Sequence, residues 1–439
     1  MRPSRGLGYG CRTQPTGTIV DAAAAPCLSR RRFLRQSAGW VWVFSLRSGG
    51  GLGANAHSLA GFDGAMAEFM DARRIPGGAL AVVRNGGIVY AKGYGWADRE
   101  QREPVCPRTL FRIASVSKPI TAVTVMRLVE EGRIDLDARV FEHLDLKPAP
   151  RPGGAAPDPR LGRITVRQLL QHTAGWDRTR SGDPMFRSRE IAEAAGESPP
   201  ATPEAIIRHM LGRPLDFDPG TRHAYSNFGY CVLGRLIEKV TGRPYETVVR
   251  EDVLARIGVR GMWIGKSRES RPGEARYYTA DGATGRSVFS DETVPEPYGT
   301  FCLEAMDAHG GWVASVVDLA RFAADPQRPP LLRPETLEAL HAPPPAPVAR
   351  GPDGRLADAY YACGWMVRPA GRGGRPNTWH NGSLPGTASL LVRGGDGLSW
   401  VVLFNQRSSD RSLPDSAIDA ALHRAADAVK KWPAPLGEL

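Results

Sequence analysis

The chain of 439 residues has few lysines, few cysteines and no long apolar run. It holds seven lysines beside 50 arginines, and six cysteines in all. No stretch approaches the ~20 consecutive apolar residues that cross a bilayer, which excludes an integral membrane protein. No CxxC, HExxH or Walker pattern is present, so neither a metal nor an organic cofactor is expected.

The remaining composition is that of a globular protein, with 42% hydrophobic and 23% charged residues. The formal net charge of +11 is concentrated in residues 1–56, which contain eight arginines and one aspartate. The other 383 residues carry a net charge of +4 with acidic and basic side chains interspersed. This pattern predicts a mixed, solvated surface and no nucleic-acid partner.

The basic N-terminal segment resembles a twin-arginine export signal. The run Ser29–Arg35 (SRRRFLR) precedes the short apolar run Ala38–Leu46, and Ala54-Asn55-Ala56 offers a small-x-small cleavage site. We therefore expect residues 1–56 to be a signal peptide and residues 57–430 to be the mature domain. The mature protein would be periplasmic or secreted, with no transmembrane segment.

The cysteines fall into two groups on this interpretation. Cys11 and Cys27 would leave with the leader, and four would remain in an oxidising compartment. Three pairings of those four are possible, and the sequence does not choose among them. Cys231 lies in an apolar helical pattern and is expected to be a buried thiol. The four are Cys106, Cys231, Cys302 and Cys363.

Hydrophobic periodicity predicts early strands, a helical middle, late strands and a terminal helix. The expected fold is α/β, with one antiparallel sheet built from both chain ends (about 57–110 and 300–430) and flanked by helices. An all-helical region at about 116–260 is inserted between them. The predicted strands are 79–83, 88–91, 360–367, 388–393 and 399–405, and the predicted helices are 116–131, 164–172, 203–211, 228–241 and 415–431, with one short helix inside the proline-interrupted loop 325–352.

Ser115 and Lys118 form the first candidate catalytic pattern, S-x-x-K at the start of the long predicted helix. The i, i+3 spacing places both side chains on one helix face, and Ser117 on another. Serine needs a base to become nucleophilic, and a desolvated lysine can serve as that base. The free N–H groups of a helix start also favour a developing negative charge.

Two further patterns combine side chains that could face one cleft. In Tyr225-Ser226-Asn227 the phenol and the amide share a face of an extended segment. In His380-Asn381-Gly382, the histidine and the glycine share a face, and glycine permits close approach of another backbone. Taken alone, the first of these two patterns is better explained by Asn227 capping the following helix while Tyr225 packs, and the second by a polar turn with a surface histidine.

In this order and with these flanks, the three patterns resemble the serine β-lactamase and penicillin-binding DD-peptidase superfamily, and most of all its class C type branch. That branch includes DD-carboxypeptidases, D-aminopeptidases and β-lactamase-like esterases. The resemblance covers roughly residues 60–430. Supporting stretches are Phe111–Ala114 (FRIA), Ile164–Gly175 (ITVRQLLQHTAG), Phe217–Gly220 (FDPG) and Gly310–Ser315 (GGWVAS).

The resemblance implies a β-lactamase/transpeptidase-like fold and a role for each site residue. Ser115 would be the acylated nucleophile, Lys118 its base and Tyr225 the group that passes protons to the leaving group and helps to activate the deacylating water. Asn227 would orient the substrate amide, and the backbone N–H groups of Ser115 and Ser383 would form the oxyanion hole. His380 and Gly382 would line the substrate site, while His172 and Asp318 are expected to be structural.

His380 departs from the lysine that most β-lactamases of this superfamily place there. A histidine with an ordinary pKa of about 6.5 is mostly neutral at pH 7, which predicts weaker recognition of a substrate carboxylate. The sequence thus predicts an exported serine esterase or amidase acting on a small-molecule or peptidoglycan-derived substrate. A DD-carboxypeptidase or weak β-lactamase is the first alternative, and a non-catalytic penicillin-binding module the second. Segments 177–200 and 266–300 carry no interpretable pattern.

Overall fold

The computed structural model describes residues 53–149, 156–324, 331–371, 374–410 and 412–437. The run Ser29–Arg35, together with Cys11 and Cys27, lies outside these residues, whereas Ala54-Asn55-Ala56 falls in the first turn of helix α1 (Gly53–Arg73). Within the described ranges, no helix has the length and apolarity needed to span a bilayer.

One eight-stranded antiparallel sheet joins the two ends of the chain, in the order β3-β2-β1-β13-β12-β11-β10-β9. The two ends meet where β1 pairs with β13, with Ala81 opposite Val401. The prediction of one antiparallel sheet built from both ends is therefore confirmed. The strands are β1 (Gly77–Arg84), β2 (Gly87–Asp98), β3 (Glu103–Pro104), β9 (Tyr360–Tyr361), β10 (Met366–Arg368), β11 (Asn377–Leu384), β12 (Thr387–Arg393) and β13 (Leu398–Phe404).

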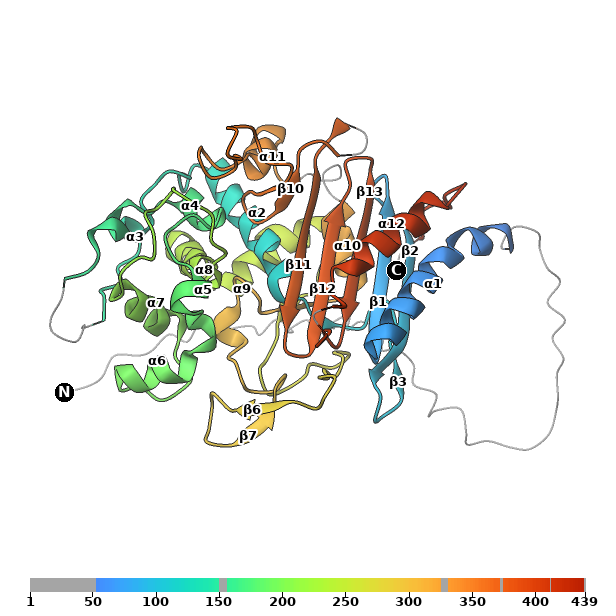
Figure 1. The fold of residues 1–439 in the computed structure, drawn as a ribbon, viewed down its shortest axis with the longest axis horizontal. Helices are drawn as coiled ribbons and strands as arrows, with labels where there is room; N and C mark the ends of the chain where they lie inside the picture. The colour runs from blue at the N-terminus through green and yellow to red at the C-terminus, as the bar shows by residue number, and fades with distance from the viewer. Residues whose placement is uncertain (1–52, 150–155, 325–330, 372–373, 411, 438–439) are drawn as a thin grey trace, which may run out of the picture.

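Helices cover both faces of this sheet (Figure 1). On one face, α1 and α12 (Ala417–Asp427) pack against the sheet, and Phe62, Met66 and Leu422 join Leu80 and Val402 in one core cluster. On the other face lies α10 (Val316–Ala324), whose Leu319 packs with Ala81 and Leu403 in the larger cluster. The alternation of inward and outward side chains along β1 and β13 thus supplies two separate cores.

The larger core continues into the helical region, which occupies the left half of Figure 1. Helix α2 (Ser117–Glu130) runs through its centre, and twelve of its fourteen residues are buried. The other helices are α3 (Val140–His143), α4 (Val166–Leu170), α5 (Arg178–Ser181), α6 (Ser188–Ala195), α7 (Pro203–Leu211), α8 (Asn227–Thr241), α9 (Tyr245–Val248) and α11 (Pro334–His341).

Short strands connect the helical region to the main sheet. β4 (Phe111–Arg112), β8 (Trp312–Ala314) and β5 (Trp263–Ile264) form a three-stranded sheet, and β4 leads directly into the 3-10 turn η2 (Ala114–Val116). The hairpin of β6 (Thr284–Arg286) and β7 (Thr293–Pro295) lies at the bottom of the molecule in the view of Figure 1. Segment 266–300, which carried no sequence pattern, thus contains this hairpin.

Three elements differ from the sequence prediction. Helix α1 was not expected, although Phe62, Met66, Phe69 and Met70 have helical spacing and are all buried. β11 was expected only as extended chain around His380, because its sequence NTWHNGSL is polar; it becomes a strand by pairing with β12 along its whole length. The predicted strand 360–367 is two short strands, β9 and β10.

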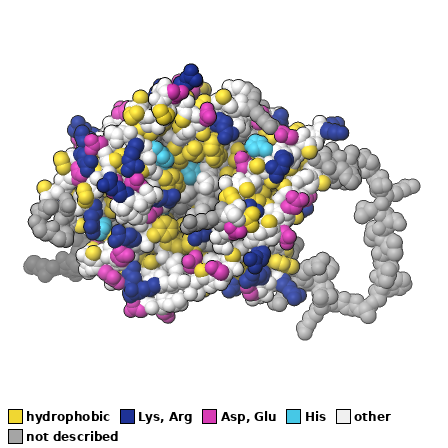
Figure 2. Space-filling model, viewed as in Figure 1, with side chains coloured by type: hydrophobic (Ala, Val, Ile, Leu, Met, Phe, Trp, Pro, Cys, Tyr) yellow, Lys and Arg dark blue, Asp and Glu magenta, His cyan; other side chains and the backbone are white. Residues whose placement is uncertain are grey.

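The described surface carries charges of both signs. Figure 2 shows basic and acidic side chains intermixed over the face that it presents. Many of them are paired in exposed or half-exposed ion pairs, among them Arg187 with Glu190 and Arg208 with Glu197. This distribution agrees with the mixed surface that the sequence predicts, and such pairs contribute little to stability because solvent screens them.

Candidate active site

Ser115 lies in the tight turn that joins β4 to α2. The turn is η2, and Ala114, the residue before the serine, has a φ of 46° although it is not glycine. This left-handed conformation is rare for a residue with a side chain, and such strain is concentrated at functional sites. The Oγ of Ser117 donates to the carbonyl oxygen of Ala114 (2.7 Å), so Ser117 fastens the turn from a different face, as its spacing predicted.

Lys118 is fully buried, and its ammonium nitrogen has three oxygen partners. Nζ lies 3.2 Å from Ser115 Oγ, 2.7 Å from Asn227 Oδ1 and 3.0 Å from the carbonyl oxygen of His309. Burial places the pKa of Lys118 well below its ordinary value; the carboxylate of Asp183 raises it and the guanidinium of Arg178 lowers it. A lysine held in this way is able to accept a proton near neutral pH.

Asn227 is free to contact Lys118 because its neighbour caps the helix. Ser226 Oγ accepts from the N–H of Gly229 (3.2 Å) and is the N-cap of α8, so Asn227 begins the helix with its side chain uncommitted to the cap. Its Nδ2 donates to Asp183 Oδ2 at 2.6 Å. Asp183 therefore fixes the orientation of the amide, with Oδ1 turned toward Lys118.

Tyr225 is half-buried beside the Ser115–Lys118 pair. Lys118 Nζ lies 4.7 Å from the centre of its ring, and its hydroxyl forms a hydrogen bond with Ser115. Burial raises the pKa of Tyr225 above its ordinary value, while the bond to Ser115 opposes this effect. The phenol is accordingly protonated at neutral pH, which suits a proton donor.

The third sequence pattern, His380-Asn381-Gly382, lies in strand β11 of the main sheet next to the Ser115 turn. In β11 the residues His380, Gly382 and Leu384 are buried, whereas Asn381 and Ser383 are exposed on the other face. A Cβ atom on Gly382 would lie 2.4 Å from the carbonyl oxygen of Ile113 and 2.9 Å from the amide nitrogen of Ser115. Only glycine allows β11 to lie this close to the nucleophile turn. The expected shared face of His380 and Gly382 is confirmed.

His380 is engaged within the protein at both ring nitrogens. Nδ1 donates to the carbonyl oxygen of Asn381 (2.7 Å), because a carbonyl oxygen can only accept. In the neutral ring, Nε2 therefore accepts from the hydroxyl of Tyr361 (3.0 Å). Burial, with a smaller contribution from the charge of Lys118, lowers the pKa of His380 to about 3. The ring is therefore neutral at pH 7, and it presents no positive charge to a ligand.

Sequence reasoning missed several groups that the fold adds to this site. Asp183 and Arg178 come from segment 177–200, which has no motif, and the His309 carbonyl is a backbone atom that no side-chain pattern marks. His172, expected to be structural, packs against Tyr225 and Tyr361 in tilted ring contacts with ring centres 4.3 and 4.4 Å apart, and its Nδ1 accepts from the N–H of Ser226.

Other features lie apart from this cluster. Asp318 accepts from Ser315 Oγ (2.6 Å) at the start of α10, which fits its expected structural role. Cys231, Cys302 and Cys363 are free and buried, so none of the three expected pairings forms; Cys231 is the buried thiol that its pattern predicted. The described residues contain no group of three potential metal ligands.

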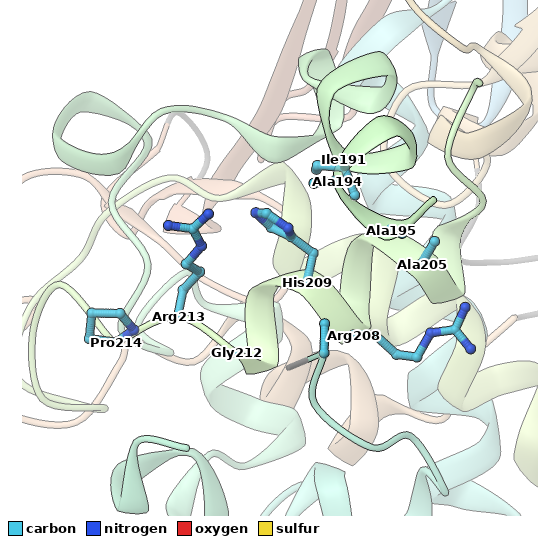
Figure 3. A pocket seen from close by; sticks show the side chains of 10 residues that line it. Ile191, Ala194, Ala195, Ala205, Arg208, His209, Gly212, Arg213 and Pro214 are labelled. Carbon is cyan, nitrogen blue, oxygen red and sulfur yellow. The ribbon is translucent and has the colours of Figure 1, made fainter. Parts of the chain in front are cut away.

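A cavity of about 330 Å³ lies between α6 and α7, away from all the predicted site residues. Figure 3 shows His209 and Arg213 directed toward one another at this cavity and Arg208 directed away. Alanines form much of the remaining wall. The lining includes one histidine but no serine, threonine or cysteine that could act as its nucleophile, so the candidate active site remains the Ser115–Lys118–Tyr225 cluster.

The geometry can be compared with known proteins. The family model described as Beta-lactamase matches residues 62–425, which is most of the chain. The chain belongs to the beta-lactamase family. The resemblance inferred from the three motifs is therefore confirmed.

The curated relatives within the beta-lactamase family have different names, and the share of the chain that aligns with this protein differs among them. Esterase EstB of Burkholderia gladioli is 36% identical over 212 residues, 45% of this chain and 48% of EstB. Penicillin-binding protein 4* of Bacillus subtilis (strain 168) is 25% identical over 351 residues, 79% of this chain and 71% of that protein. The chain spans less than half the length of the first curated relatives it matches, EstB included.

Among solved structures, the D-amino acid amidase of Ochrobactrum anthropi SV3, complexed with L-phenylalanine amide, superimposes with a TM-score of 0.65. The match covers 85% of this chain and 99% of the amidase, at 22% sequence identity. At this identity the likeness shows the fold alone. The expected β-lactamase/transpeptidase-like fold is thereby confirmed.

Proposed function

We propose that this chain is an exported serine hydrolase that cleaves an ester or amide bond through an acyl-enzyme on Ser115. The observation that carries the proposal is the 3.2 Å contact between Ser115 Oγ and the buried Nζ of Lys118. A buried lysine with a lowered pKa, in contact with a serine on a strained turn, is the arrangement that nucleophilic catalysis requires.

Acylation begins when neutral Lys118 takes the proton of Ser115 Oγ as Oγ bonds to the carbonyl carbon of the substrate. The resulting Lys118 ammonium remains bound to Asn227 Oδ1 and the His309 carbonyl, which stabilise its charge. Tyr225 gives its phenolic proton to the departing alcohol or amine as the carbonyl–leaving group bond breaks, and regains a proton from Lys118. Deacylation reverses these transfers, with water in place of the leaving group and Ser115 as the group that leaves.

The negative oxygen formed during each step requires hydrogen-bond donors. We assign these donors to the backbone N–H groups of Ser115 and Ser383, supported by the close approach of Gly382 to the Ser115 amide nitrogen. The exposed side chain of Ser383 lies on the other face of β11, which agrees with a role for its backbone only. Loss of one such donor costs about 3–4 kcal/mol of transition-state stabilisation.

Substrate choice within this reaction remains part of the proposal. The similarity to EstB favours an ester or a related amide. A DD-carboxypeptidase or weak β-lactamase is the second candidate, because the alignment with penicillin-binding protein 4* extends over 79% of the chain. A non-catalytic binding module is the third, and the complete Ser115–Lys118–Tyr225 set disfavours it.

Intact-mass spectrometry of the purified protein tests these candidates together. The protein is mixed with p-nitrophenyl esters, D-amino amides or a fluorescent penicillin, and both adduct mass and product release are followed. We expect a transient acyl adduct with ester or amide turnover. Penicillin turnover would favour the second candidate. A stable penicillin adduct without any turnover would indicate the binding module, and the absence of any adduct and any turnover would contradict the proposal.

We also propose export by the twin-arginine route, on the basis of Arg30 and Arg31. Changing both to lysine keeps the charge but removes the arginine pair, so we expect precursor to accumulate in the cytoplasm. Cell fractionation with immunoblotting measures this, and Arg12→Lys, outside the run, is the matched control. Undiminished export of the double variant would refute the proposed route.

A further inference from the structure

Arg178 lies directly over the ring of Tyr225. Its guanidinium carbon is 4.6 Å from the ring centre, and its side chain is exposed on α5. Arginine stacks well on aromatic faces, and stacking leaves the N–H groups at its edge available to a ligand. Arg178 is thus an exposed cation in contact with the residue that we propose to protonate the leaving group.

The backbone that carries Arg178 is firmly attached. Asp177 caps α5 by accepting from the N–H of Thr179 (2.9 Å), and the N–H of Asp177 donates to Asp216 (2.8 Å). Ser181 Oγ also donates to the Asp216 carboxylate, at 2.8 Å. The location of Arg178 over Tyr225 is therefore set before any ligand arrives, which reduces the entropy lost on binding.

The guanidinium of Arg178 lacks the hydrogen-bond partners within the described residues that the guanidinium groups of neighbouring arginines have. Arg180 donates to the Asp216 carbonyl (3.1 Å), Arg187 to Glu190 (2.8 Å) and Arg222 to Asp177 (2.9 Å). Among the residues that the structure describes, Arg178 has neither a hydrogen bond nor an ion pair. Its N–H donors are available in the fork geometry that matches a carboxylate.

The other charged groups at the site are not available to an anion. Lys118 is buried with three oxygen partners, and His380 is neutral with both ring nitrogens engaged. The Asp183 carboxylate accepts from Asn227 Nδ2 (2.6 Å) and from the N–H of Met185 (3.1 Å). The positive charge that His380 does not supply is therefore present on a different element, at the Tyr225 side of the site.

We propose that Arg178 is a specificity-determining residue that binds an anionic group, such as a carboxylate, on the leaving group of the substrate. The proposal rests on the proposed function, because it needs Tyr225 to lie on the leaving-group side. It also changes the expectation drawn from His380 alone: carboxylate-bearing leaving groups are recognised in spite of the neutral histidine, through α5 rather than β11.

Three acetate esters that differ in the charge of their leaving group test this. They are 3-acetoxybenzoate, 3-acetylphenyl acetate and 3-acetoxyphenyl-trimethylammonium, which release an anionic, a neutral and a cationic phenol. In Arg178→Gln we expect kcat/KM for the anionic ester to fall about tenfold relative to the neutral one. For the cationic ester, kcat/KM relative to the neutral ester should increase in Arg178→Gln. Arg180→Gln, the same change two residues along α5, should leave both ratios as in the wild type.

The outcomes separate the two proposals. A uniform loss on all three esters, or unchanged ratios in Arg178→Gln while the wild type hydrolyses them, would overturn the role of Arg178 and leave the proposed function standing. Should the wild type neither hydrolyse any ester nor acquire an adduct on Ser115, the proposed function fails and the inference fails with it. A shift of the anionic ratio in Arg180→Gln equal to that in Arg178→Gln would show only a general surface charge effect.

Discussion

Replacing Ser115 by alanine is expected to lower ester or amide turnover by at least ~10⁴-fold and to abolish the acyl adduct. The reason is chemical: Oγ is the atom that bonds to the substrate, and it is the hydroxyl oxygen to which Lys118 Nζ is hydrogen-bonded, at 3.2 Å. The Ser115→Ala change removes only one hydroxyl group from a turn, so we expect the fold to remain intact. Stopped-flow turnover and intact-mass spectrometry measure the two effects.

A matched serine variant separates the chemistry from a general effect of mutation. Ser270 is exposed in segment 266–300, so Ser270→Ala should retain both turnover and adduct. Circular dichroism should give the same spectrum for both variants and the wild type. If the Ser115→Ala protein still gains the adduct mass, another residue is the nucleophile and the assignment of Ser115 is wrong.

The part of the site that the sequence predicts is the part with short-range spacing. Ser115 and Lys118 lie one helical turn apart, and Tyr225 and Asn227 flank the Ser226 cap, so local geometry alone brings each pair to one face. What joins the pairs is long-range: the Lys118–Asn227 contact spans 109 residues. Before the structure, only the family resemblance indicated that these two pairs of residues lie in one site.

The groups that the sequence did not predict act through partners far along the chain. Asp183 has no neighbouring motif, and it matters because it binds an amide 44 residues away. Tyr361 contacts His380 across two strands, β9 and β11, of which β11 is polar enough to be missed as a strand. Strand formation there depends on pairing with β12, which is a tertiary effect that overrides local propensity.

The same distinction explains the errors in the fold prediction. The hairpin of β1 and β2 and helix α7 follow their local patterns, and α7 occupies the predicted range Pro203–Leu211. Helix α1 has the helical spacing of apolar residues, but its first residues overlap the end of the predicted leader, which hides the helix in the sequence pattern. None of the three pairings expected from export forms, because Cys231 and Cys363 are buried as free thiols in the larger core cluster and Cys302 is buried as a free thiol in a small separate cluster.

Replacing Lys118 by methionine is the second change with a large expected effect. Loss of the base should lower kcat/KM by about 10²–10⁴-fold. In the wild type, kcat/KM should rise with pH as Lys118 loses its proton, at a pH well below the ordinary lysine pKa because burial lowers that pKa. The variant should lack this ascending limb. A limb that persists unchanged in Lys118→Met would assign the titration to another group.

Stability should respond to the same buried lysine, with a sign that follows from proton counting. Between its lowered folded pKa and its ordinary value of 10.5, Lys118 binds a proton in the unfolded chain but not in the folded one. The free energy of unfolding should therefore rise with pH in this window, by up to about 1.4 kcal/mol per pH unit for one proton. Lys118→Met removes this contribution, so its stability relative to the wild type should fall as pH increases from 7 toward 10.

Urea unfolding at several pH values measures that difference, with Lys147→Met as the control because Lys147 is exposed. The control should follow the wild-type pH dependence, since the side chain of Lys147 is exposed and its replacement leaves the buried site unchanged. In Lys118→Met the Asn227 and His309 oxygens lose a hydrogen-bond donor at every pH, which lowers the stability of the variant independently of pH. The test is therefore the slope of the free energy of unfolding against pH, not its absolute value. Parallel curves for Lys118→Met and the wild type would mean that Lys118 is protonated in the folded protein, and the neutral base required for acylation would then be absent.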